Sequence, residues 1–72
     1  MIPLEMLRSG ECGRIAQVDG DEQFVSRLAE MGFREGVGVR MVRAGSPCIV
    51  AVGDHRMTFR ADELALVLVE LA

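Results

Sequence analysis

The sequence predicts a mainly β domain, a small and partly open barrel of about five strands with one short α-helix inserted after the first strand. Three observations support this fold class. Short apolar runs recur with the two-residue period of strands, tight glycine-containing turns separate them, and one segment alone has the helical period. The chain has 72 residues, half of them hydrophobic, which is enough for one small core. We therefore expect residues 1–72 to form a single domain.

The first elements are a short lead-in and a strand at residues 13–18. Leu4 and Leu7 lie three residues apart in the lead-in, and we expect them to plug one end of the core. Ile15 and Val18 are also three residues apart, which breaks the alternation of a strand. A bulge or sharp bend is therefore predicted between them.

The single helix is predicted at residues 22–31, with Asp21 as its N-cap. A helix this short is not stable alone, so it must pack on the sheet. The apolar residues at helical spacing are Phe24, Val25, Leu28 and Met31.

The stretch after the helix is predicted to reverse the chain sharply. Gly32 is expected to end the helix in a left-handed backbone conformation, and Gly36 to lead into the next strand. Phe33 is expected to fold back on the last helical turn, against Leu28 or Ala29. Two interpretations stay open, a helix cap with no further role or a segment that shapes a binding surface.

The second strand is predicted at residues 37–42, and a hairpin follows it. Residues 48–52 and 55–60 flank Gly53-Asp54, a two-residue turn signal with glycine first. If the hairpin closes on these two residues, three pairs share one face: Val52–His55, Val50–Met57 and Cys48–Phe59.

The last strand is predicted at residues 65–71, after a tight turn at residues 61–64. This strand is apolar on both faces, a pattern typical of a strand that is buried on both sides. Either the helix covers its second face or that face meets another molecule. Its faces carry Val67 and Val69 on one side, and Leu66 and Leu68 on the other.

Composition disfavours several classes of partner. The net charge is −3, and the eight cations, all arginine, are scattered, so we expect no nucleic acid and no anionic membrane surface as partner. With three Phe and no Trp or Tyr, the chain lacks the aromatic residues that bind Pro-rich peptides or stack on single-stranded RNA.

No apolar run reaches the roughly 18 residues that span a bilayer, so we expect no direct membrane insertion. Residues 1–4 do not resemble a signal peptide, and we expect a cytoplasmic protein with reduced thiols.

Reactive side chains are few. No nucleophile–base pair or phosphate-binding loop can be recognised, so we predict no enzyme and no catalytic residue. In the predicted hairpin Cys48 and His55 lie roughly 13 Å apart at ~3.3 Å per residue, too far to share an ion. Cys48 is expected in the core. We predict no cofactor and no metal site within one chain, and a transition-metal site between chains, through Cys12 or His55, stays open.

The order and spacing of several motifs carry a family resemblance. The most specific is Leu28-x-x-Met31-Gly32-Phe33-x-x-Gly36, which follows Gly10-x-x-Gly13-x-Ile15-x-x-Val18. Ser46-Pro47-Cys48-Ile49-Val50 and Met57-x-Phe59-Arg60 continue it. Over residues 2–70 this arrangement resembles the FeoA family, the small accessory proteins of bacterial ferrous iron transport.

The resemblance implies an SH3-like barrel and a cytoplasmic partner for FeoB, the membrane Fe(II) transporter with a cytosolic GTPase domain. Binding to FeoB would modulate its GTPase and transport activity. Two features depart from the family pattern. Glu35 stands where members commonly have Pro, and the turn at residues 44–47 is shorter than usual, which puts contacts through that loop in doubt.

The partner surface is expected around the helix end and the last strand. Leu28 and Phe33 are expected to hold the helix in place, and Arg34 to contact the partner directly. The candidate partner-binding residues are Leu28, Met31, Phe33, Arg34, Leu66 and Leu68, with Gly32 and Gly36 as structural hinges.

Two other functions compete with this one. The first is a metal-responsive regulator similar to the C-terminal domain of diphtheria-toxin-type repressors, which would bind a transition metal at a subunit contact through Cys12, His55 or carboxylates. The second is an RNA-binding or ribosome-binding barrel, which the charge and the aromatic content disfavour. A homo-oligomer also stays open.

Overall fold

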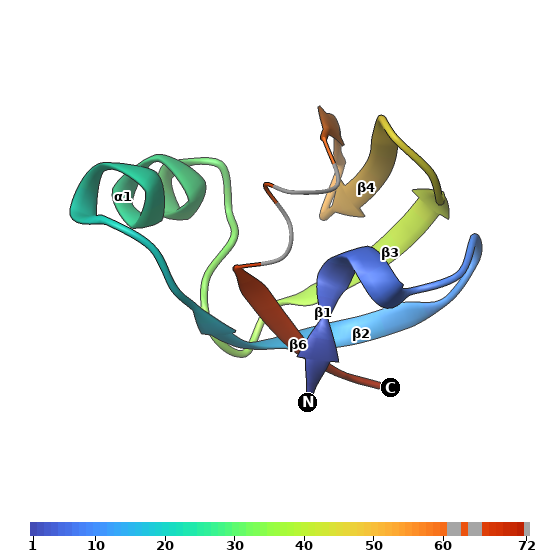
Figure 1. Ribbon diagram of the computed structural model, residues 1–72, viewed down its shortest axis with the longest axis horizontal. Helices are drawn as coiled ribbons and strands as arrows, with labels where there is room; N and C mark the ends of the chain where they lie inside the picture. The colour runs from blue at the N-terminus through green and yellow to red at the C-terminus, as the bar shows by residue number, and fades with distance from the viewer. Residues whose placement is uncertain (61–62, 64–65, 72) are drawn as a thin grey trace.

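The computed structural model describes residues 1–60, 63 and 66–71, and it confirms the mainly β class. One antiparallel sheet has the strand order β1-β6-β2-β3-β4-β5. In Figure 1 the sheet is strongly curved, and α1 stands to one side of it. The elements in chain order are β1 (Ile2–Pro3), the 3-10 helix η1 (Leu4–Met6), β2 (Cys12–Val18), α1 (Glu22–Glu30), β3 (Gly38–Arg43), β4 (Cys48–Val52), β5 (His55–Phe59) and β6 (Val67–Leu71).

The sheet has one strand more than the sequence indicates. The additional strand is β1, whose two residues pair with β6 through Ile2–Val69 and Pro3–Leu68. Its partner lies at the other end of the chain, so no local pattern marks it. The helix consequently follows the second strand, although it still comes directly after the strand predicted at residues 13–18.

The lead-in closes one end of the core, as predicted. Leu4 and Leu7 are fully buried, and η1 places them against the inner face of the sheet. The predicted irregularity of β2 is also present, because the register between β2 and β6 shifts between Ile15 and Gln17. This shift lets Ile15 face the core while the strand bends.

Asp21 caps the N-terminus of α1, as predicted. Its Oδ1 accepts a hydrogen bond of 2.8 Å from the backbone N–H of Phe24. A cap of this kind contributes about 1 kcal/mol. The helix ends at Glu30, one residue earlier than predicted, and Met31 is its C-cap.

The reversal after α1 has the hydrogen bonds of a Schellman motif. Gly32 has φ +97°, and its N–H donates to the carbonyl of Ala29 at 3.1 Å. The N–H of Phe33 donates to the carbonyl of Leu28 at 2.8 Å. The predicted fold-back is therefore confirmed, and the Phe33 ring meets Phe59 edge-on, with centroids 5.4 Å apart.

The β4–β5 hairpin closes in the predicted register, with Val52–His55, Val50–Met57 and Cys48–Phe59 paired. Gly53, the first turn residue, has φ +58°, the conformation that a glycine-first turn requires. The β4 side chains on the paired face are buried, whereas on β5 burial increases from exposed His55 to buried Phe59.

The two faces of the last strand differ in burial. On β6, Val67 and Val69 are fully buried and Leu68 is half-buried, whereas Leu66, which directly precedes the strand, is 42% exposed. A Cβ built on Gly20 would lie 3.4 Å from Leu66 Cδ1 and 2.8 Å from Phe24 Cδ2, so Leu66 lies near the start of α1.

The turn predicted at residues 61–64 lies mostly outside the described residues. Within it, Glu63 and Arg60 are joined by two hydrogen bonds. The N–H of Glu63 donates to the Arg60 carbonyl, and the N–H of Arg60 donates to Glu63 Oε1, both at 3.0 Å.

Gly32→Ala should destabilise the fold, because a residue with a Cβ carries a penalty of roughly 1–2 kcal/mol in the left-handed region. The nearest atom to that Cβ would be Val52 Cγ1 at 3.4 Å, an ordinary contact, so the backbone rather than crowding causes the loss. Urea denaturation followed by circular dichroism measures the effect. Gly38→Ala is the control, because Gly38 has no positive φ and open space around it. Equal losses in both variants would contradict the assignment.

Candidate partner-binding groove

The predicted partner-binding residues divide into buried and exposed groups. Leu28 and Phe33 are each 1% exposed, so neither offers appreciable surface to a partner. Both belong to the core and connect α1 to the hairpin. Their placement fits the supporting role expected of them.

Arg34 is exposed, but its side chain also holds the helix end. Its Nε donates to the carbonyl of Ala29 at 3.1 Å, which satisfies one of the free carbonyls of the last turn. A hollow of about 230 Å³ lies beside it, between the C-terminal half of α1 and Val18 of β2.

Met31 and Leu66 lie at opposite ends of α1. Met31 is the C-cap, whereas Leu66 lies near Gly20, before the first turn. A helix of nine residues is about 13 Å long at 1.5 Å per residue, so the two side chains do not form one patch. Leu68 lies on β6, whereas Leu66 lies directly before that strand.

The sequence did not reveal a groove between α1 and β5, which we call the α1–β5 groove. It consists of two adjoining hollows that share Met31 and Met57, both half-buried. The first, of about 440 Å³, is also lined by Glu30, Gly32, His55 and Arg56. The second, of about 300 Å³, is also lined by Phe24, Arg27, Leu28, Thr58, Phe59 and Glu63.

Part of this groove could have been anticipated. Met31 was a candidate residue, and the hairpin register places Met57 opposite buried Val50. The groove itself depends on where the helix end lies over the hairpin. The contact between Phe33 and Phe59 fixes that position, and no sequence pattern specifies it.

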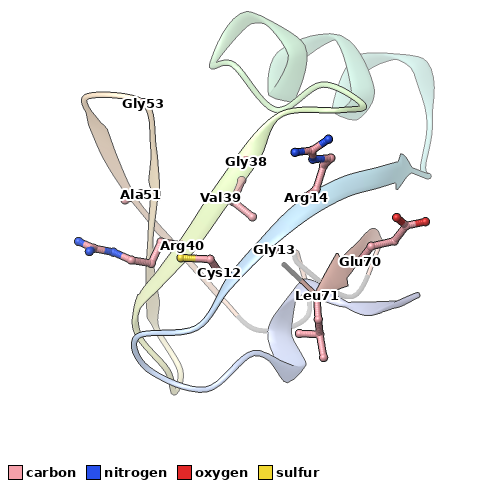
Figure 2. Close-up of a pocket in the computed structure, with 10 residues that line it drawn as sticks. All are labelled: Cys12, Gly13, Arg14, Gly38, Val39, Arg40, Ala51, Gly53, Glu70 and Leu71. Atoms are coloured by element: carbon pink, nitrogen blue, oxygen red, sulfur yellow. The ribbon is translucent and has the colours of Figure 1, made fainter.

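A separate hollow of about 600 Å³ lies on the outer face of the sheet, over β2, β3, β4 and the end of β6. Figure 2 shows that the guanidinium groups of Arg14 and Arg40 point in different directions, and that the Cys12 thiol lies on the Arg40 side. Cys12 and Arg40 are cross-strand neighbours, and both are exposed. Arg14 and Glu70, which also line the hollow, are cross-strand neighbours on β2 and β6.

The two cysteines differ in environment, and Cys48 lies in the core as predicted. Cys48 is buried and its Sγ donates to the carbonyl of Phe59 at 3.5 Å, whereas Cys12 is exposed. Burial raises the pKa of the Cys48 thiol above its usual value. Cys12 on β2 and His55 on β5 are three strand spacings apart, roughly 14 Å at ~4.8 Å per spacing. Among the described residues no three His, Cys, Asp or Glu side chains gather into a metal site.

Comparison with known proteins identifies the fold. The model of the FeoA domain matches residues 2–71. No curated protein sequence matches the chain. None of the helices in the described part of the chain is both long enough and apolar enough to cross a membrane.

Solved structures match over nearly the whole chain. A crystal structure of an iron uptake regulatory protein (FeoA) has a TM-score of 0.92 at 22% identity, with 99% of this chain and 97% of that chain covered. FeoA of Stenotrophomonas maltophilia, described as a prokaryotic SH3 domain protein and solved with zinc, has a TM-score of 0.86 at 32% identity, with 97% and 90% covered. The predicted SH3-like fold is thereby confirmed. A manganese-dependent transcriptional repressor shares the fold at a TM-score of 0.87 and 18% identity, but this chain spans only 41% of it.

The thiols should differ in reactivity. At about pH 8, iodoacetamide should alkylate Cys12 rapidly, because it is exposed, whereas Cys48 should react only after unfolding, because burial limits both access and thiolate formation. Mass spectrometry of the folded protein measures one fast adduct per chain. Cys12→Ser should abolish the fast adduct, and Cys48→Ala should retain it. Two fast adducts on the folded chain would contradict this environment for Cys48.

Proposed function

Because the chain belongs to the FeoA family, whose role is in ferrous iron transport, we propose that it is a cytoplasmic accessory protein that binds a FeoB-type Fe(II) transporter. Binding modulates the GTPase and transport activity of that transporter. The observation that carries the proposal is the family match over residues 2–71. The family is one of accessory transport proteins and is not a known enzyme class.

Two further observations support a binding role. The Stenotrophomonas maltophilia relative, at 32% identity, has been discussed as a ferrous iron transport activating factor. In this chain the α1–β5 groove offers half-buried methionines beside charged residues, a composition typical of interaction surfaces. We place the transporter contact at this groove, with Met31 in its centre.

A metal-responsive regulatory domain is the second candidate. It is favoured by the zinc in the Stenotrophomonas maltophilia structure and by the fold shared with metal-dependent repressors. Repressors at 18% identity support the fold alone, so the transport role has the stronger support. In this chain the candidate ligands are Cys12 and His55, which would have to meet between two copies.

Met31→Ser should weaken binding to the cognate FeoB. Loss of the thioether from the centre of the groove should reduce affinity by about tenfold, equivalent to about 1.4 kcal/mol. Co-elution of the purified proteins and stimulation or inhibition of GTP hydrolysis measure it under reducing conditions. Met6→Ser is the matched control, because Met6 is exposed on η1 rather than in the groove. If wild-type protein neither co-elutes nor changes GTP hydrolysis, the proposed function is wrong.

Anaerobic titration with Fe(II) and Zn(II) separates the two candidates. If the transport role is correct, we expect no binding of micromolar affinity or tighter to the isolated chain, as measured by calorimetry. Micromolar binding that is lost in both Cys12→Ser and His55→Ala would instead favour the regulatory domain. Cys48→Ala serves as a control for a buried thiol that cannot take part.

A further inference from the structure

We propose that β5 is a docking edge that accepts an extended segment of the partner, with alternating apolar and acidic residues, as an added strand in the α1–β5 groove. This inference deepens the proposed function and rests on it for the identity of the partner. It rests on three independent features of the described residues, which are the free edge, the spacing of the two hollows and the local charge.

The first feature is the position of β5 at the end of the sheet, where β4 is the only strand paired with it in the described part of the chain. Antiparallel strands alternate hydrogen-bonded and non-bonded pairs, and a two-residue turn is closed by a bonded pair, here Val52–His55. The backbone N–H and C=O groups of Arg56 and Thr58 therefore point away from β4. Among the described residues they make no hydrogen bond to a loop or side chain, so they can bond an added strand.

The second feature is the spacing of the hollows along β5. One lies beside His55 to Met57 and the other beside Met57 to Phe59, so their centres are about two residues apart. Two residues correspond to about 6.6–7 Å, which is the repeat of side chains on one face of a strand. An added strand would place alternate apolar side chains into the two hollows, against Met31 and Met57.

The third feature is positive charge on the opposite face of the same edge. Arg56 is exposed there, and Arg60, 77% exposed, continues the row beyond Thr58. Between residues 48 and 60 Asp54, in the turn, is the only acidic residue, although the chain as a whole has a net charge of −3. Arg60 contacts Glu63 at 3.7 Å, an exposed pair that is weak. Glu30 and Glu63 line the two hollows, so the positive charge is concentrated on β5 and directly after it, where Arg56 and Arg60 favour acidic side chains on the added strand.

The helix lies on the far side of the groove from the edge strand. Residues of α1 and of β5 line the same two hollows, so the helix faces the edge across the groove. An extended segment would add one strand beside β5, whereas pairing with a second copy would bring that copy's helix and remaining strands to the same edge. The occupant is therefore a segment of another protein, with its apolar side chains toward Met57 and its acidic side chains toward Arg56.

The proposal is tested with the peptide Glu-Leu-Glu-Val-Glu-Leu-Glu-amide, labelled with fluorescein at its N-terminus. Its binding to the full chain is measured by fluorescence anisotropy and by shifts of the Arg56 and Thr58 amide resonances. Thr58→Pro removes an outward N–H without removing a bond to β4 and should weaken binding at least tenfold, whereas Thr58→Ala should change it less than twofold. Arg56→Glu should also weaken binding at least fivefold. Arg14→Glu on β2, which is three strand positions away from β5 in the sheet, is its control.

If Thr58→Pro does not fold, a peptide N-methylated at its Glu residues provides the test. The Glu residues would pair with Arg56 and Thr58, so this peptide keeps its side chains but loses the backbone donors that face β5. Its failure to bind supports an added strand, and unchanged binding overturns it. Equal binding of a peptide with Lys in place of each Glu would overturn the acidic preference. Dimerisation of the free chain through β5 would overturn the single-segment occupant.

Transporter binding distinguishes this inference from the proposed function. If wild-type protein and Thr58→Pro co-elute equally with the transporter, the docking edge is wrong and the function stands. If the peptide binds as described but wild-type protein never co-elutes, the edge stands and the transporter is not the partner.

Discussion

The hydrogen bond from the Phe33 N–H to the Leu28 carbonyl is the link on which the arrangement depends. It ends the helix and turns the chain so that the Phe33 ring meets Phe59 of the hairpin. A nine-residue helix has little stability of its own, so its place over β5 is set by this anchor and by the burial of Leu28. The α1–β5 groove exists because the helix is held at that distance from the edge strand.

Local sequence signals predicted the local structures well. Asp21 and Gly32 mark the ends of α1, and Gly53 fixes the hairpin register, because each acts on residues within a few positions of itself. Longer-range features were missed. The pairing of Ile2 with Val69 joins residues from opposite ends of the chain, and no local pattern specifies it.

The candidate site was predicted only in part, for the same physical reason. Met31 was identified from its motif, but its neighbour in the groove, Met57, comes from another element and is brought there by tertiary packing. Arg34 was expected to contact a partner, and its bond to the Ala29 carbonyl could not be read from spacing alone. Surface chemistry in a domain this small depends on how elements meet, which the sequence encodes indirectly.

The edge strand β5 combines a free edge with cationic side chains. A free edge invites pairing between identical chains, and cationic side chains such as Arg56 discourage it by like-charge repulsion. The same side chain attracts segments of opposite charge. One residue thus serves both solubility and selectivity.

The pairing of β1 with β6 brings the two ends of the domain side by side, as Figure 1 shows. A unit whose entry and exit points adjoin can be inserted into, or appended to, a larger polypeptide without separating its strands. The shared fold in the repressor, of which this domain spans 41%, shows that such a unit is compatible with a longer protein. The two ends meet on β1 and β6, at the opposite end of the strand order from β5, so a fused neighbour would leave the helix-side groove accessible.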